Sequence, residues 1–366
     1  MYNTALATID LAALRHNLHR ARALAPGSKL MAMIKANGYG HGLLPVARAL
    51  SDADGLAVAR LDEAVQLREQ GLAQRLLLLG TLLDDDDLAL CAQHHIDIVI
   101  HEADTARRLA RARLPRPVHC WLKLDTGMHR LGLMPGQLQP VLDTLAASAA
   151  VGEQVLMTHF ACADEVDSAA TAEQLACFAA MTRGLGLPTS LANSAALIDQ
   201  PASHGDWNRP GIMLYGDNPL HGHREVDVRP VMTLSARVLA VRDIPPGAAV
   251  GYGATWISRR PSRIATVGIG YGDGYPRHAP NGTPVLVNGH RAALAGRVSM
   301  DSICVDVTDC GPVSPGDPVE LWGRALPARE IADHAGTISY ALFTGISQRV
   351  EFVYEGLDVG RLTSDV

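Results

Sequence analysis

A lysine stands between an apolar run and a glycine-rich turn near the start of the chain. Residues 30–34 are apolar, Lys35 follows them directly, and Gly38, Gly40 and Gly42 come soon after. Burial beside such a turn disfavours an ammonium group, so this amine could serve as a nucleophile near neutral pH. On this segment alone, a solvated lysine in an ordinary strand-to-helix turn is an equally good interpretation.

Polar residues also lie at the ends of several later apolar segments: Lys123, Arg130, His159, Asn193, Ser194, Asn208 and Arg209, the last two close to Gly211 and Ile212. Taken singly, His159 fits a core histidine, Ser194 a helix cap, and the two arginines surface ion pairs. Lys123 within an apolar strand is harder to explain, because an unpaired buried ammonium is costly. Together these residues indicate an amine nucleophile and an anionic ligand that carries phosphate.

Two chemistries fit such a set of residues. A Schiff-base aldolase would use the lysine amine against a carbonyl substrate. An enzyme that depends on pyridoxal 5′-phosphate (PLP) would use the same amine to hold its cofactor covalently. The residues themselves leave both open.

The elements that must position these residues alternate regularly. Apolar runs predict strands at residues 30–34, 55–58, 76–79, 97–100, 118–124, 154–160, 189–192 and 211–215. Helical patterns lie between them near residues 43–50, 61–70, 84–93, 103–112, 135–149, 171–184 and 194–199. This alternation favours a (β/α)₈ barrel, with chemistry at the carboxyl ends of its strands. No GxGxxG follows the first strand to support a dinucleotide-binding fold.

The pattern changes near residue 229. Helical periodicity gives way to glycine, proline and β-branched residues, and Asn288-Gly289 between two apolar runs predicts a hairpin. Only residues 328–335 have a helical pattern in this part. We therefore expect two closely packed domains, a barrel over residues 1–229 and a mostly β domain over residues 230–366.

Composition excludes several classes of protein. The 366 residues are 48% hydrophobic and 19% charged, with a net charge of -6 and no basic stripe that would suit nucleic acid. No apolar stretch is long enough to span a membrane, and the N-terminus does not resemble a secretory signal. The six cysteines are scattered without a zinc-like spacing, which is typical of buried free thiols in a reducing compartment. A cytoplasmic protein without a metal site is expected.

The sequence resembles the alanine racemase family over nearly its whole length. The matching segments follow the family's order, at residues 34–42, 123–132, 158–160, 193–195, 209–212, 251–256, 268–274, 296–301 and 338–340. The resemblance implies a PLP-binding barrel followed by a β domain, which the first few residues of the chain would join. It favours the cofactor chemistry over the aldolase.

The resemblance also assigns cofactor contacts. Lys35 would carry PLP, and Arg209 would face its pyridine nitrogen. The phosphate would be held by Tyr39, Ser194, Tyr340 and the backbone amides near Gly211 and Ile212. Because an arginine does not give up its proton, the ring nitrogen would stay unprotonated, which suits racemisation better than transamination.

For catalysis, the resemblance implies interconversion of L-alanine and D-alanine through an external aldimine. Proton transfer needs a base on one face and an acid on the other. These roles would fall to Lys35 and to Tyr252 of the partner subunit, so the enzyme would be a homodimer with shared active sites. His159, near Arg209, is the family's candidate for lowering the barrier to transfer at the tyrosine.

Substrate contacts follow from the same resemblance. The alanine carboxylate would meet Arg130 and the partner subunit's backbone at Met300, next to Asp301. Lys123 matches a lysine that can be carbamylated, and the resulting anion could orient Arg130. The entrance would be narrowed by Tyr252 and Tyr340 and approached past two arginines, Arg277 and Arg297.

Alternatives within the same fold are a PLP racemase or decarboxylase acting on another amino acid. From a different class, a PLP-binding protein without catalysis would share Lys35 and the phosphate site. Such a single-barrel protein would lack Tyr252 and the whole second domain, so the sequence disfavours it. A role in cell-wall precursor synthesis and one in D-alanine breakdown are both compatible with the sequence.

Overall fold

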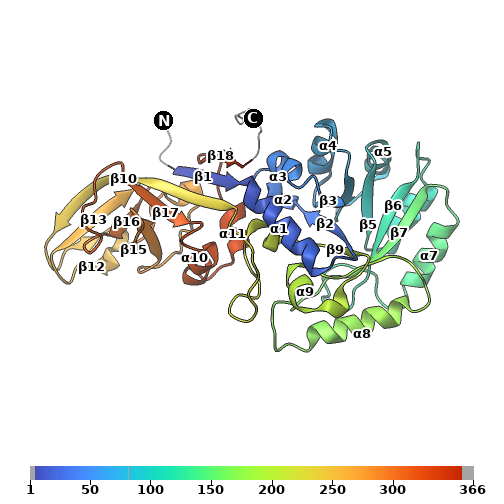
Figure 1. Cartoon of the computed structure of the whole chain (residues 1–366). Helices are drawn as coiled ribbons and strands as arrows, with labels where there is room; N and C mark the ends of the chain where they lie inside the picture. Colours follow the sequence, from blue (N-terminus) through green and yellow to red (C-terminus); the bar gives the residue numbers. More distant parts are fainter. Residues whose placement is uncertain (1–4, 81, 357–366) are drawn as a thin grey trace.

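The computed structural model describes residues 5–80 and 82–356, and it places a parallel barrel beside an antiparallel sheet (Figure 1). The predicted (β/α)₈ barrel is confirmed, and it closes in chain order from β2 to β9. Its strands are β2 (Lys29–Met33), β3 (Gly55–Val58), β4 (Arg75–Leu78), β5 (Ile96–Ile100), β6 (Val118–Lys123), β7 (Val151–Met157), β8 (Thr189–Ser190) and β9 (Trp207–Asn208). Their continuous apolar runs are typical of parallel strands buried on both faces.

Helices cover the barrel and connect its strands. They are α2 (Lys35–Tyr39), α3 (Leu43–Ala49), α4 (Leu61–Glu69), α5 (Asp85–Gln93), α6 (Ala103–Arg111), α7 (Leu138–Ala146), α8 (Ala170–Thr182) and α9 (Ser194–Asp199), followed by the short 3₁₀ helix η1 (Pro201–Ser203). Before the barrel, α1 (Leu11–Leu24) begins at Asp10, whose carboxylate accepts a hydrogen bond from the backbone N–H of Ala13.

The predicted strand at residues 211–215 is wrong. Residues Ile212–Tyr215 form the 3₁₀ helix η2, and the eighth barrel strand is β9, which pairs with β8 and β2. A four-residue apolar run has no periodicity that separates a buried strand from a buried helical turn. Gly216, at φ 88°, ends the turn in the left-handed region.

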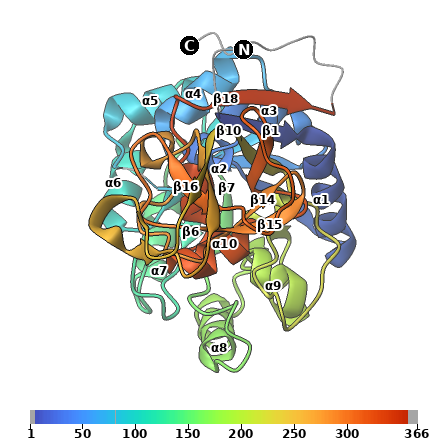
Figure 2. The same ribbon diagram turned by 90° about the vertical axis from the view of Figure 1, so that its left-hand side faces the viewer.

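This mostly antiparallel sheet contains strands from both ends of the chain, and its first and last strands along the chain pair with each other in parallel. Its order is β13-β16-β15-β14-β17-β10-β1-β18. Strand β13 also pairs with β10, so the strands from β13 to β10 in this order form a second closed barrel. The strands are β1 (Ala5–Asp10), β10 (Met232–Ile244), β13 (Ser262–Val267), β14 (Pro284–Val287), β15 (His290–Leu294), β16 (Ile303–Asp306), β17 (Pro318–Trp322) and β18 (Glu351–Glu355). Figure 2 shows the molecule from the side of this sheet, with the barrel behind it.

Several short elements lie between the strands of the sheet along the chain. The ribbon of β11 (Ala249–Val250) and β12 (Trp256–Ile257) flanks the 3₁₀ helix η3 (Tyr252–Ala254), and η4 (Tyr271–Asp273) follows β13. The hairpin predicted at Asn288-Gly289 is confirmed. Strands β14 and β15 pair, and the turn that joins them has φ of 51° at Asn288 and 79° at Gly289.

The second domain has more helix than the sequence suggested. The predicted helix α10 (Ala328–Ala335) is present, but the expectation that it is the only one is wrong, because α11 (Ser339–Thr344) follows it. A six-residue helix shows too few turns for its periodicity to stand out. This helix matters because it carries Tyr340 to the barrel.

One contiguous apolar core runs through the barrel and the sheet. All six cysteines are free thiols, as expected, but the expectation that all are buried is wrong, because Cys162, Cys177 and Cys304 are half-buried. Within residues 5–80 and 82–356, no cluster of acidic, histidine or cysteine side chains is suited to a metal ion. None of the helices in these ranges has the length and hydrophobicity needed to cross a membrane.

Candidate active site

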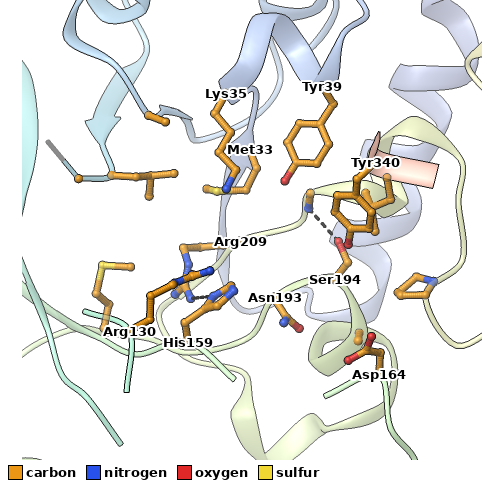
Figure 3. Close-up of a pocket in the computed structure, with 18 of the residues that line it drawn as sticks. Met33, Lys35, Tyr39, Arg130, His159, Asp164, Asn193, Ser194, Arg209 and Tyr340 are labelled. Carbon is orange, nitrogen blue, oxygen red and sulfur yellow. Dashed lines mark hydrogen bonds between the residues drawn. The ribbon is translucent and has the colours of Figure 1, made fainter. Parts of the chain in front are cut away.

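A cavity of about 340 Å³ lies at the carboxyl ends of the barrel strands (Figure 3). It brings together most of the predicted site residues: Lys35, Tyr39, Lys123, Arg130, His159, Ser194, Arg209, Gly211, Ile212 and Tyr340. Four of these carry cationic groups, and the only carboxylate among the described lining residues is Asp164. A cavity with this lining is suited to a small anionic ligand.

Lys35 and Tyr39 are the first and last residues of an unusual turn. Ala36, Asn37, Gly38 and Tyr39 all have positive φ, between 52° and 62°, so α2 is a left-handed turn. A left-handed conformation costs roughly 1–2 kcal/mol for each residue that has a Cβ atom. Surrounding contacts must therefore hold this turn, and it fixes how both side chains enter the cavity.

The amine of Lys35 is held in a partly buried, electropositive setting. Burial is the largest cause that lowers its pKa; Arg130 and Arg209 lower it further, and Glu63 raises it. The neutral amine is thus more accessible near neutral pH than in an exposed lysine. This is the property required of a nucleophile or a base.

Arg209 is held in place by hydrogen bonds to backbone carbonyl groups. Its Nη1 donates to the carbonyl and Oγ of Ser190, both at 2.8 Å, and its Nη2 donates to the carbonyl of Thr158 at 2.5 Å and that of Leu191 at 3.1 Å. Burial lowers the pKa of Arg209 to about 10, which leaves the group a cation at neutral pH. It is therefore a rigid charged donor at the wall of the cavity.

His159 is a neutral acceptor beside that arginine. Its Nδ1 lies 3.4 Å from Nη2 of Arg209. Burial, and then the charge of Arg209, hold the pKa of His159 well below its usual value. The interpretation of His159 as an isolated core histidine is not supported, because the ring lines the cavity.

Lys123 also faces the cavity from the end of β6. Burial is the main cause that lowers its pKa to about 8, followed by the charges of Arg130, Arg209 and Lys35. Lys123 is half-buried, not fully buried as the sequence suggested, and the carboxylate of Asp125 is the one group that raises its pKa.

Ser194 and Gly211 form a small cradle. Asn193, not Ser194, caps α9 through its side chain, which leaves the Ser194 hydroxyl free to accept from Gly211 N–H at 2.8 Å and Met213 N–H at 3.4 Å. A Cβ atom on Gly211 would lie 2.7 Å from the hydroxyl of Tyr39. Backbone N–H groups, a serine and a tyrosine hydroxyl around a close backbone approach are features of phosphate sites.

Tyrosine rings line the same side of the cavity. Tyr39 stacks on Tyr215 with ring centroids 4.6 Å apart, and the ring of Tyr340 lies 5.8 Å from that of Tyr39. Helix α11, which carries Tyr340, is tied to the barrel because Ser339 and Arg329 both contact the carboxylate of Asp217. The sheet domain thus supplies one wall of the cavity within a single chain.

The remaining predicted residues lie away from the cavity of their own chain. Tyr252 is 69% exposed and Met300 is 53% exposed, both on the sheet domain. The Asp301 carboxylate accepts from Nη2 of Arg349 at 2.6 Å. Arg297 packs against Gly253, and Arg277 lies over the ring of Tyr271 at 5.9 Å. One chain alone therefore does not unite Tyr252, Met300 or Asp301 with Lys35.

Sequence reasoning missed Asp164. It lies in the loop after β7, five residues beyond His159, and lines the cavity near Tyr340. The loop that follows a barrel strand is where such a residue belongs, but nothing in the sequence separates it from nearby Glu165 and Asp167.

Comparison with known proteins identifies the family. The profile described as "Alanine racemase, N-terminal domain" matches residues 9–219, and "Alanine racemase, C-terminal domain" matches residues 231–354. The chain belongs to the alanine racemase family. The family expected from the sequence is confirmed.

Individual alanine racemases match over almost their whole length. The chain is 48% identical over 347 residues to that of Pseudomonas taetrolens, covering 94% of this chain and 97% of the relative. It is 49% identical over 353 residues to that of an Azoarcus strain, covering 96% and 99%. The structure of the biosynthetic alanine racemase from Pseudomonas aeruginosa superposes with a TM-score of 0.94 at 46% identity, covering 97% and 100%.

The cofactor expectation is also confirmed. A related structure, alanine racemase from Bartonella henselae with covalently bound pyridoxal phosphate, has a TM-score of 0.87 at 31% identity, covering 96% of this chain and 99% of the other. As a member of this alanine racemase family, the chain is a PLP-dependent isomerase. The cavity fits the cofactor, since it offers an amine, a phosphate cradle and a fixed cationic donor in one anion-binding space.

Proposed function

We propose that the chain interconverts L-alanine and D-alanine with PLP held in the cavity at the carboxyl ends of the barrel strands. The observation that carries this assignment is the placement of the Lys35 amine opposite the immobilised guanidinium of Arg209 in one electropositive cavity. When bound, PLP withdraws electrons from the α-carbon of an amino acid and so acidifies its proton.

We carry the cofactor contacts expected from the sequence over to the cavity. Lys35 would hold the cofactor covalently, and Arg209 would face its pyridine nitrogen. Tyr39, Ser194, Tyr340 and the backbone at Gly211 and Ile212 hold the phosphate. The support is that all of these residues line one cavity and that Ser194 already gathers backbone N–H groups there.

We assign proton transfer on one face of the substrate to Lys35 and on the other to Tyr252 of the partner subunit. Burial and neighbouring cations lower the pKa of Lys35, which favours the base form. His159 lies beside Arg209 where it can act on the second transfer. Arg130 binds the alanine carboxylate together with the partner subunit's backbone at Met300, next to Asp301 of the partner subunit.

The position of Tyr252 supports a homodimer. Its side chain is exposed and does not line the cavity of its own chain, so in this proposal the second proton-transfer group comes from another copy. We further propose that residues 1–229 and 230–366 form two domains of a cytoplasmic enzyme. Strand β1 lies in the sheet with β10, which supports the assignment of residues Ala5–Asp10 to the second domain.

Borohydride reduction followed by peptide mapping tests the cofactor assignment. The sequence contains three lysines, Lys29, Lys35 and Lys123, so the reduced label can be placed unambiguously. We expect the label on Lys35 alone, together with racemisation of both alanine enantiomers by the unreduced protein. Label on Lys123, or a protein that takes up no PLP, would overturn the assignment.

We predict that Lys123 carries a carbamate. The neutral amine adds to CO₂, a nitrogen–carbon bond forms and a proton is released; a pKa near 8 makes this amine available at neutral pH. The product is an anion beside Arg130, which removes the unpaired cation and can orient the guanidinium. With ¹³C-bicarbonate, a carbamate resonance is expected for the native protein and for Lys29→Ala but not for Lys123→Ala. A spectrum without that resonance contradicts the prediction.

A further inference from the structure

Glu63 lies next to the turn that carries Lys35, although none of the roles above uses it. It is the third residue of α4, and one carboxylate oxygen accepts from the backbone N–H groups of Ala59 at 3.2 Å and Arg60 at 3.3 Å. These contacts alone are those of an ordinary residue that caps the start of a helix.

The second carboxylate oxygen of Glu63 makes a hydrogen bond that helix capping does not require. It accepts from the backbone N–H of Asn37 at 3.0 Å, across 26 positions of sequence. Asn37 lies within the left-handed turn between Lys35 and Tyr39, where the positive φ of Ala36, Asn37 and Tyr39 is unfavourable. One carboxylate therefore joins the end of β3 and the start of α4 to this turn.

We propose that Glu63 is a positioning residue for the cofactor site, whose carboxylate holds the left-handed turn and thereby places Lys35 and Tyr39 in the cavity. The proposal rests on the assignment of Lys35 as the lysine that binds PLP. Asn37 strengthens the same turn from the other side, since its side-chain oxygen accepts from Leu43 N–H at 2.8 Å at the start of α3.

The negative charge of Glu63 also affects the pKa of Lys35. The groups that act on Lys35 include the cations Arg130 and Arg209, which lower its pKa, and Glu63, which raises it; Lys123 and His159 face the same space. Removing the negative charge of Glu63 must lower the pKa of Lys35 further.

Three variants separate these roles. Glu63→Ala removes both contacts, whereas Glu63→Gln removes the charge and offers one acceptor oxygen instead of two. Glu69→Gln is the matched control, because Glu69 is an exposed residue of the same helix. For each, we would measure the PLP dissociation constant from the visible absorbance of the bound cofactor, the unfolding temperature, and the pH profile of kcat, which reports the groups of the substrate complex, where the Lys35 amine is no longer bound to the cofactor.

We expect Glu63→Ala to weaken PLP binding roughly ten- to hundredfold, the effect of losing a hydrogen bond to a charged group. Glu63→Gln should show a smaller loss, and the limb of its pH profile that reports Lys35 should move to lower pH. Glu69→Gln should match the native protein.

A Glu63→Ala protein that unfolds at lower temperature but binds PLP normally would overturn the proposal and leave only the capping role. If that variant does not fold, an unchanged pH profile for Glu63→Gln would overturn the proposal in the same way. Failure of the native protein to attach PLP to Lys35 is a different result, because it removes the proposed function itself.

Discussion

Replacing Lys35 by alanine is expected to reduce kcat/KM by at least about 10⁴-fold for both alanine enantiomers. The change removes the covalent anchor for the cofactor and one of the two proton-transfer groups, and general acid–base catalysis alone contributes roughly 10²- to 10⁴-fold. Circular dichroism, which follows the conversion of either enantiomer, measures both directions. PLP should still bind through the phosphate cradle and Arg209, but borohydride should no longer fix it to the protein.

Lys29 provides the control, at the start of the strand that precedes Lys35. It lies at the opposite end of β2, with its Nζ 5.2 Å from the ring centroid of Trp207, and it does not line the cavity. Lys29→Ala should retain native activity. If Lys35→Ala instead kept activity within about tenfold of the native protein, Lys123, the other amine in the cavity, would be the candidate that holds the cofactor.

The barrel could be predicted from the sequence because its physical signature is strong. Parallel strands buried on both faces need continuous apolar runs, and the helix that returns the chain needs a 3.6-residue period, so the two alternate visibly. The prediction failed where elements are short. Residues 211–215 are as apolar as a strand, yet Ile212–Tyr215 is a 3₁₀ helix, and α11 spans only Ser339–Thr344.

Residues of the candidate site were predictable to different degrees. The barrel topology brings the carboxyl ends of the strands to one side, so Lys35, Lys123 and Arg209 could be grouped without any relative in hand. Tyr252 could not be grouped with them in this way, because it lies exposed on the sheet domain and not at the end of a barrel strand. Only the resemblance to the family indicated it. Glu63 escaped notice because a glutamate at the third position of a helix is commonplace.

The electrostatics of the cavity suggest why its ligand must be anionic. Lys35, Lys123, Arg130 and Arg209 gather there, and the pKa values of Lys35, Lys123 and Arg209 are all lowered. The charges of Arg130 and Arg209 lower the pKa of both Lys35 and Lys123, so a bound phosphate and a carboxylate substrate would offset this unfavourable gathering of positive charge. The same cations therefore favour binding of the anionic cofactor and lower the pKa of Lys35, which keeps its amine reactive.

Replacing Tyr252 by phenylalanine is expected to affect the two faces of the substrate unequally. The phenyl ring keeps the shape of the side chain and loses only the hydroxyl, so abstraction of the α-proton from one enantiomer should fall about 10²- to 10⁴-fold. Abstraction from the other enantiomer, assigned to Lys35, should fall far less. Exchange of the α-proton with solvent deuterium, followed for each enantiomer separately, measures the two transfers, and the less affected face serves as the internal control.

Mixing Tyr252→Phe with Lys35→Ala tests whether that tyrosine acts across a dimer interface. Random pairing gives mixed dimers for about half of the population, and each would combine an intact Lys35 with an intact Tyr252 at one of its two sites. Roughly a quarter of native activity should return, although each variant alone is impaired. Because Tyr252 is 69% exposed and absent from the cavity of its own chain, activity that stays low on mixing, or equal losses of exchange for both enantiomers, would contradict the two-base assignment.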